Sequence, residues 1–221
     1  PESSHHEEGP GQNEIDFRYS TPLNAADNAV TFKSVVQTIA RRNGLFADFS
    51  PKPLMHESGN GLHINVSVKA ESGEDVTESF MAGVLEHTVE MTAFFNPVAA
   101  SYKRLGEKKA PKYVTWSHEN RSQLIRIPAV KSESHRRMEL RSPDPAANPY
   151  IVYALIIYAG LDGIKRNLKP AAPCNCNLFT ADSAVTDSLT NLPDTIEKAR
   201  NIAKNSEFIK RVLPEGCAES I

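Results

Sequence analysis

The sequence predicts an α+β fold, in which helices pack on the outer face of a curved, largely antiparallel sheet. Strand-like and long helical segments alternate along the 221 residues. Two of the strand-like segments, 61–68 and 135–141, carry polar side chains on one face and mostly apolar side chains on the other. A polar strand face has to stay uncovered, so we expect the helices on one side of the sheet only.

The composition excludes several classes of partner. A formal net charge of −2 gives no electrostatic attraction to nucleic acid or to an anionic membrane. The three cysteines do not form a disulfide framework and fit a reducing compartment, so we expect a cytoplasmic protein. Cys174 and Cys176 are too close in sequence for the usual zinc pair, and we interpret both as ordinary thiols. The apolar run 150–161 is too short to span a membrane and is typical of a buried helix.

Residues 2–17 predict a polar hairpin. Residues 9–12, Gly-Pro-Gly-Gln, are a strong turn signal, with Pro and Gly at the positions that favour them. If the chain reverses there, Glu7 lies opposite Glu14, about 4.5–5.5 Å away at Cβ. That separation suits two carboxylates that share a divalent cation, and His5 lies on the same strand face as Glu7. A Pro-Gly turn fits a tight hairpin poorly, so the residues alone leave open both the register and the alternative of a solvated acidic hairpin.

The next segments predict a strand, a helix and a second short strand. The first strand covers 12–20. Residues 24–42 form a packing helix, with Asn24 as its N-cap and the Asn-Gly pair at 43–44 as its stop. The short strand covers 45–50, where Pro residues then interrupt it.

Residues 61–68 are the clearest strand of the sequence. Leu62, Ile64, Val66 and Val68 alternate with polar side chains, so they share the apolar face. The opposite face offers an imidazole, an amide and a hydroxyl, which are groups that coordinate or orient ligands. These groups belong to His63, Asn65 and Ser67. A purely structural role for this histidine is equally compatible with the pattern.

A long helix and a basic segment follow. Residues 77–100 predict the helix, with Thr77 as N-cap and Pro97 ending or kinking it. Residues 101–114 carry five basic side chains without a regular aromatic stripe, which argues against nucleic-acid binding. Within them, residues 106–111 are typical of a mobile polar loop.

Two further strand-like segments carry arginines. Residues 119–128 contain Arg121 and Arg126, and residues 135–141 place three charged side chains on one strand face. These three are Arg137, Glu139 and Arg141. They form either a solvated stripe or a site for phosphate or carboxylate, because the guanidinium fork matches both anions.

The C-terminal third is predicted to be helical. Asn148 caps a helix at 149–168 that is apolar on most sides and is expected to be the central core helix. A Pro-rich connection follows at 169–180. The segment 182–221 is expected to be a helical part of the same domain, with helices after residue 192.

Taken together, these segments closely resemble the C-terminal catalytic part of glutamine synthetase of the bacterial type. The resemblance extends to about Leu192, and its motifs occur in the order of the family. They are HHEEGPGQNE at 5–14, PKPL at 51–54, SGNGLHINVS at 58–67, SYKRL at 101–105, NRSQLIRIP at 120–128 and RMELRSPDPAANPY at 137–150.

The resemblance implies two divalent-cation sites that are partly formed in this chain. Glu7 and Glu14 match the ligands of the first cation, and His63 and Glu139 match ligands of the second. Carboxylate oxygens with one imidazole suit Mg²⁺ or Mn²⁺, in agreement with the residue types.

The resemblance also implies sites for ATP and glutamate. The residues that match positions near the nucleotide and its phosphates are Glu2, Asn65, Ser67, Arg126 and Arg137. The residues that match glutamate-binding positions are Gly59, Arg104, Arg121 and Arg141. Of these, Arg121 and Arg141 are the candidate catalytic residues.

The implied reaction is the ATP-dependent ligation of ammonia to the γ-carboxylate of glutamate through γ-glutamyl phosphate. The loop 106–111 is expected to close over this intermediate and exclude water. Relative to the family, the chain at 1–221 lacks the N-terminal β-grasp domain and the first catalytic strands. We therefore expect a fragment that is inactive alone, taken from a protein that forms a homo-oligomeric ring.

Two positions depart from the family pattern. Lys109 stands where the family usually has a glutamate that helps deprotonate ammonium, and Phe179 stands where adenylylated members have tyrosine. Phe179 predicts that this modification is absent. Lys109 predicts weaker ammonium binding and keeps open a γ-glutamyl ligase for another amine. A glutamine-synthetase-like binding protein without turnover is a third hypothesis, which the complete set of metal-matching residues argues against.

Overall fold

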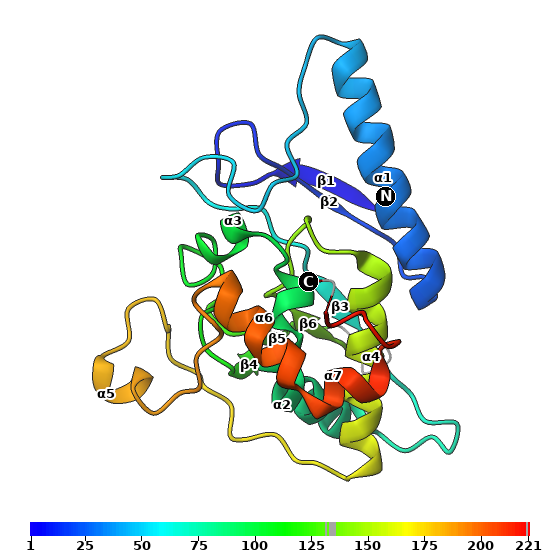
Figure 1. Cartoon of the computed structure of the whole chain (residues 1–221), viewed down its shortest axis with the longest axis vertical. Coiled ribbons are helices and arrows are strands. Elements are labelled where there is room, and N and C mark those ends of the chain that lie inside the picture. Colours follow the sequence, from blue (N-terminus) through cyan, green and yellow to red (C-terminus); the bar gives the residue numbers. More distant parts are fainter. Residues whose placement is uncertain (131, 133–135, 220) are drawn as a thin grey trace.

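The computed structural model of the chain describes residues 1–130, 132, 136–219 and 221. Within this part, four strands form a sheet of order β3-β6-β5-β4, with β3–β6 and β6–β5 antiparallel and β5–β4 parallel (Figure 1). The strands are β3 (Ile64–Val66), β4 (Trp116–His118), β5 (Ile125–Ile127) and β6 (Met138–Leu140). The predicted α+β class with a largely antiparallel sheet is confirmed.

The two faces of this sheet differ in polarity. Asn65, Glu139 and Arg126 lie side by side across β3, β6 and β5. Because side chains alternate along a strand, their neighbours point to the opposite face, where they are buried. These apolar neighbours are Ile64, Ile125, Ile127, Met138 and Leu140. The alternation therefore separates a polar face from the hydrophobic core.

Helices cover the apolar face. Helix α2 (Thr77–Phe95) packs along α4 (Pro149–Lys165), and both contribute buried side chains to the core beneath the sheet. Helices α6 (Ile196–Asn205) and α7 (Glu207–Val212) pack on α2, while α5 (Ser183–Thr186) lies at the periphery (Figure 1). One side of the sheet is thus left for the site.

Helices α2 and α4 approach each other at glycines. A Cβ on Gly83 would lie 2.1 Å from the carbonyl oxygen of Ala159, and a Cβ on Gly163 would lie 2.1 Å from that of Ser79. Both distances are far below van der Waals contact. The two backbones therefore touch directly, and any larger side chain would push the helices apart.

The N-terminal part forms a separate layer beside the body. Strands β1 (Ser3–His6) and β2 (Asn13–Asp16) pair as an antiparallel hairpin, and helix α1 (Pro22–Arg42) lies on the same side of the body (Figure 1). Lys33 Nζ donates to the Pro145 carbonyl at 2.6 Å, which ties α1 to the segment before α4. Several apolar side chains of α1 are 45–65% exposed. They are Leu23, Val30, Val35 and Ile39.

Two predicted strands differ from the structure. The strand predicted at 12–20 is confined to β2, and the strand predicted at 45–50 is wrong. The Asn60 side chain donates to the carbonyls of Asp48 and Ser50, at 3.3 and 2.9 Å. These carbonyls are therefore bonded to a side chain and not to a neighbouring strand.

The ends of two predicted helices also differ. Helix α1 begins at Pro22 and not after an Asn24 cap, because proline fixes φ for the first helical turn. Thr77 is the first residue of α2 and not its cap, and its N–H donates to the Asp75 carboxylate at 2.9 Å. Helix α2 ends at Phe95, and the short helix α3 (Ala99–Tyr102) follows Pro97, which lacks an N–H.

The other predicted elements are confirmed in position and shortened in extent. The predicted strands 61–68 and 135–141 become β3 and β6, and His135 lies outside the described residues. Asn148 caps α4 as predicted, accepting from the Tyr150 N–H at 3.0 Å. None of the helices in the described part has both the length and the apolar character needed to cross a membrane.

Gly163→Ala tests the backbone contact between α2 and α4. Alanine is the better helix former by about 1 kcal/mol, so helix propensity predicts stabilisation. We expect the opposite, a loss of about 1–3 kcal/mol in the free energy of unfolding, because the new methyl group overlaps the Ser79 carbonyl. Urea unfolding followed by circular dichroism measures it. Asn28→Ala, on the exposed side of α1, is the control, and a Gly163→Ala chain as stable as wild type would contradict the contact.

Candidate active site

The polar face of the sheet is centred on a buried carboxylate. Glu139 of β6 is 5% exposed, and its oxygens accept from the Nε of Arg126 on β5. Arg141 Nη1 lies 3.3 Å from the same carboxylate, and His63 Nδ1 lies 3.4 Å from its Oε1. The predicted metal ligands His63 and Glu139 are thus brought together, along with Arg126 and Arg141.

The surroundings fix the charge states of this group. Burial would raise the pKa of Glu139, but hydrogen bonds from His63 and Arg126 and the charge of Arg141 outweigh it and hold the pKa well below its usual range. Burial lowers the pKa of His63, although Glu139 opposes this. An ionised carboxylate beside a neutral imidazole is the combination that binds divalent cations.

The hairpin differs in register from the prediction. Glu14 is paired with His5 and not with Glu7, so the prediction that Glu7 lies opposite Glu14 was wrong. The turn at 9–12 forms as predicted, with Gln12 N–H donating to the Gly9 carbonyl at 2.9 Å and Gly11 at φ 71°. The Glu7 N–H then donates to the Gln12 carbonyl at 3.0 Å. The turn at 9–12 is therefore separated from the end of β1 by two residues and leads directly into β2. The shift is by two residues, so Glu7 keeps its strand face.

His5, Glu7 and Glu14 form a second group of donors. One ligand atom from each lies within 4.8 Å of the others, and His5 Nε2 is 3.6 Å from Glu14 Oε2. Burial raises the pKa of Glu14, and the charges of Asp16, Glu7 and Glu139 add to the effect. The Glu139 carboxylate is therefore close enough to act on Glu14. Two carboxylates and an imidazole fit Mg²⁺ or Mn²⁺. The sequence pattern already placed His5 on the face of Glu7, yet His5 was not predicted as a ligand.

Gln12 fastens the hairpin to the body. Its Nε2 donates to the Gly59 carbonyl at 3.1 Å and to Asn60 Oδ1 at 2.9 Å. Position 59 has room for glycine only. A Cβ there would lie 2.5 Å from the Pro51 carbonyl oxygen and 2.9 Å from Arg104 Cγ. The predicted substrate residue Gly59 therefore lies where the hairpin, Pro51 and Arg104 meet.

The arginines predicted to bind glutamate lie in different environments. Arg104 donates to the carbonyls of Ser142 and Arg141, at 2.7 and 3.1 Å, and burial lowers its pKa to about 10. Burial lowers the pKa of Arg141 as well, with a contribution from the charge of exposed Arg121. Arg104 thus supports the backbone that carries Arg141, while Arg121 faces solvent.

The residues predicted to lie near the nucleotide are spread over the sheet and the hairpin. Arg137 Nε donates to Asn65 Oδ1 at 3.1 Å, which joins the ends of β6 and β3. Ser67 is exposed just beyond β3. Glu2 is exposed at the start of the hairpin, and its N–H donates to the Asp16 carbonyl at 2.7 Å. Asn65 and Arg137 therefore share one end of the polar face, and Glu2 belongs to the hairpin.

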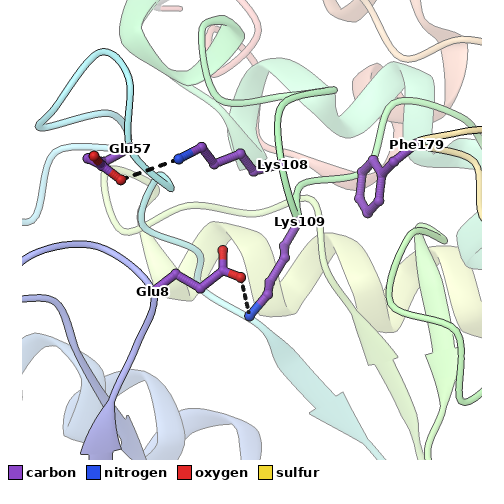
Figure 2. A pocket seen from close by; sticks show the side chains of 5 residues that line it. All are labelled: Glu8, Glu57, Lys108, Lys109 and Phe179. Atoms are coloured by element: carbon purple, nitrogen blue, oxygen red, sulfur yellow. Dashed lines mark hydrogen bonds and ion pairs between the residues drawn. The ribbon is translucent and has the colours of Figure 1, made fainter.

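The loop 106–111 is held against the hairpin by ion pairs. Lys109 Nζ lies 3.2 Å from Glu7 Oε1 and 3.0 Å from Glu8 Oε1, and Lys108 Nζ lies 3.3 Å from Glu57 Oε2. Figure 2 shows Glu8, Glu57, Lys108 and Lys109 reaching toward one another from three segments, with Phe179 on the other side of Lys109. These five residues line an open hollow of about 590 Å³. Glu8 and Glu57 were not predicted, because their partners are distant in sequence.

Comparison with known proteins relates this arrangement to one family. Residues 1–221 match the family model described as glutamine synthetase, catalytic domain. The chain is 43% identical over 227 residues to a glutamine synthetase of Clostridium saccharobutylicum, covering 96% of the chain and 51% of that protein. It is 44% identical over 227 residues to a glutamine synthetase of Staphylococcus aureus, with the same coverage. The chain therefore spans about half the length of these curated relatives.

Two solved structures are also similar to the chain. A chain described as a GmaS/ADP complex superposes with a TM-score of 0.84 at 31% identity, covering 99% of this chain and 53% of that one. A chain described as apo GmaS without ligand gives a TM-score of 0.83 at 31% identity, covering 98% and 52%.

His5→Ala tests the donor group on the hairpin. Loss of the imidazole should raise the dissociation constant for Mn²⁺ by about tenfold or more, as loss of groups around a metal typically does. Isothermal titration or Mn²⁺ electron paramagnetic resonance measures it. His6→Ala is the matched control, because His6 is exposed and points to the other face of the same strand. Equal affinity of His5→Ala and wild type would exclude His5 as a ligand.

Proposed function

The chain belongs to the glutamine synthetase catalytic-domain family, and we propose that its parent protein ligates ammonia to the γ-carboxylate of glutamate at the expense of ATP. The observation that carries this proposal is the buried Glu139, with His63, Arg126 and Arg141 around it. A second donor group, His5, Glu7 and Glu14, supports it, and the charge of Glu139 acts on its Glu14. Metal ligands beside arginines are what phosphoryl transfer to a carboxylate requires.

The proposed reaction has two steps. A γ-carboxylate oxygen of glutamate attacks the γ-phosphorus of ATP, and ADP leaves. The nitrogen of ammonia then attacks the acyl carbon, phosphate leaves with the bonding electrons, and a proton is lost from nitrogen. Divalent cations, when bound, neutralise phosphate oxygens in this chemistry.

The residues of the chain are assigned to this reaction as follows. Arg126 and Arg137 hold phosphate oxygens at the polar sheet face, and Arg121 and Arg141 stabilise the negative charge on the transferring group. His63 stays neutral beside Glu139 and retains its lone pair for a cation. Asn65, Ser67 and Glu2 are proposed for the nucleotide, and the ADP described for a structural relative supports a nucleotide site in this fold.

Gly59 and Arg104 are proposed to act on the glutamate side by position. Gly59 permits the close approach of Pro51 and of the Arg104 side chain. Arg104 fixes the carbonyls of Arg141 and Ser142. The loop 106–111 is proposed to exclude water from the acyl phosphate. Its attachment to Glu7 and Glu8 through Lys109 supports a position at the edge of the site.

A second candidate function is a γ-glutamyl ligase for an amine other than ammonia. It rests on Lys109, whose ammonium group lies in an ion pair with Glu7 at the proposed cation site. A fixed positive charge there repels ammonium and favours an acceptor with a different charge pattern.

The whole protein is proposed to form a homo-oligomeric ring, in which the remaining site residues come from outside this chain. The isolated chain is proposed to be inactive.

Glu139→Gln in the full-length protein tests the proposed function. The amide loses the charge that the arginines and a cation require, so phosphate release with glutamate, ATP and ammonium should fall by about 100-fold or more. A coupled phosphate assay measures it. Glu74→Gln, in an exposed turn, is the control. Undiminished activity of Glu139→Gln would contradict the proposed function. Glutamine formation by the isolated chain would contradict its proposed inactivity.

The acceptor is tested by comparing ammonium with methylamine in the same assay. Faster phosphate release with ammonium supports glutamine synthesis, and faster release with methylamine supports the second candidate. Lys109→Glu should lower the KM for ammonium and for methylammonium by roughly fivefold or more, because both are cations at neutral pH and an attractive charge replaces a repulsive one. Lys69→Glu, on the exposed segment after β3, is the control. Unchanged KM values in Lys109→Glu would exclude a role of Lys109 in binding the acceptor.

A further inference from the structure

Cys174 and Cys176 form a thiol pair that the proposed reaction does not use. Their sulfur atoms are 3.3 Å apart, with Cys176 exposed and Cys174 half-buried. A disulfide bond is about 2.05 Å long, so the sulfurs need to move by only about 1 Å to bond. Interpreting both as independent ordinary thiols was therefore incomplete.

The surroundings favour thiol–disulfide chemistry over metal binding. In the described part of the chain, no further His, Cys, Asp or Glu donor lies within 4.8 Å of both thiols. Structural zinc sites use four protein ligands. Two thiols without further donors are suited to forming a bond with each other.

The thiol pair is bonded to the turn that carries Arg121. The Cys176 carbonyl accepts from Asn120 Nδ2 at 2.8 Å and from Gln123 Nε2 at 3.0 Å. Asn120 Oδ1 in turn accepts from the Ser122 N–H at 2.9 Å. The residues on both sides of Arg121 are thus fixed by the backbone of Cys176.

The other end of the segment is anchored to the sheet. The Cys174 N–H donates to the carbonyl of Trp116 on β4 at 2.8 Å, and Trp116 Nε1 donates to the Ala171 carbonyl at 2.7 Å. Cys174 and Cys176 are therefore both held by hydrogen bonds of their backbone. Formation of a bond between their sulfurs would strain these contacts, including the bonds from Asn120 and Gln123 to the Cys176 carbonyl.

We propose that Cys174 and Cys176 form a reversible dithiol–disulfide pair whose oxidation displaces the turn carrying Arg121 and lowers ligase activity. Its effect on activity rests on the proposed function. The oxidant class is a low-molecular-weight disulfide. The Cys176 thiolate attacks one sulfur of it and releases a thiolate; Cys174 then loses its proton and attacks the Cys176 sulfur, releasing the second. Two protein thiols are oxidised, and the small disulfide is reduced to two thiols.

A bridge across one intervening residue closes a small ring. Departures from relaxed disulfide geometry make the bond easier to reduce, which suits a reversible device. The hydrogen bond with Cys174 raises the pKa of Cys176, so the rate of oxidation should increase as the pH rises and thiolate forms.

Treatment of the full-length protein with oxidised glutathione tests the proposal. Peptide mass spectrometry should find Cys174 bridged to Cys176 with loss of two hydrogens, and dithiothreitol should reverse it. Hydrogen exchange of residues 117–123 should increase in the bridged form. Activity should fall by about tenfold to a hundredfold, as small displacements of catalytic groups do.

Matched variants separate this effect from other thiol reactions. Cys217→Ser should remain sensitive, and the double variant Cys174→Ser with Cys176→Ser should be resistant. Absence of the bridge, a stable glutathione adduct on wild type, or a bridge that leaves hydrogen exchange at 117–123 unchanged would each overturn the proposal. Because the bridge and the exchange are read without turnover, a failure of the proposed function is recognised independently.

Discussion

The structure depends on the ion pairs that keep Glu139 charged inside the protein. A buried carboxylate without partners is costly, and removal of one partner from a buried pair is strongly destabilising. Arg126, Arg141 and His63 supply the compensation, from β5, from the end of β6 and from just before β3. The strand order β3-β6-β5 is therefore required both for the fold and for the candidate site.

The remaining parts of the site are attached to this centre by few contacts. Gln12 holds the hairpin to Gly59 and Asn60, and Lys109 holds the loop to the hairpin. A cation that binds His5, Glu7 and Glu14 has to compete with the Lys109 ammonium group for Glu7. Cation binding and the position of the loop are thus linked through one carboxylate.

The sequence was sufficient for features that follow from local alternation. Period-two patterns placed His63 and Glu139 on polar strand faces, and helical periodicity identified α2 and α4. The register of the hairpin could not be predicted from the sequence, because the turn lies asymmetrically between the strands. The strand expected at 45–50 failed since a side chain from residue 60 binds its carbonyls. The Lys109–Glu7 contact joins residues 102 positions apart, which no local pattern reveals.

Helix α1 has a practical consequence for work with this chain. Its exposed leucine, valines and isoleucine can associate between copies of a molecule whose net charge of −2 provides little repulsion. Sulfate and phosphate strengthen such apolar association. Preparations of the chain by itself are therefore best concentrated and crystallised without these salts, at a pH well above the isoelectric point of about 6.4.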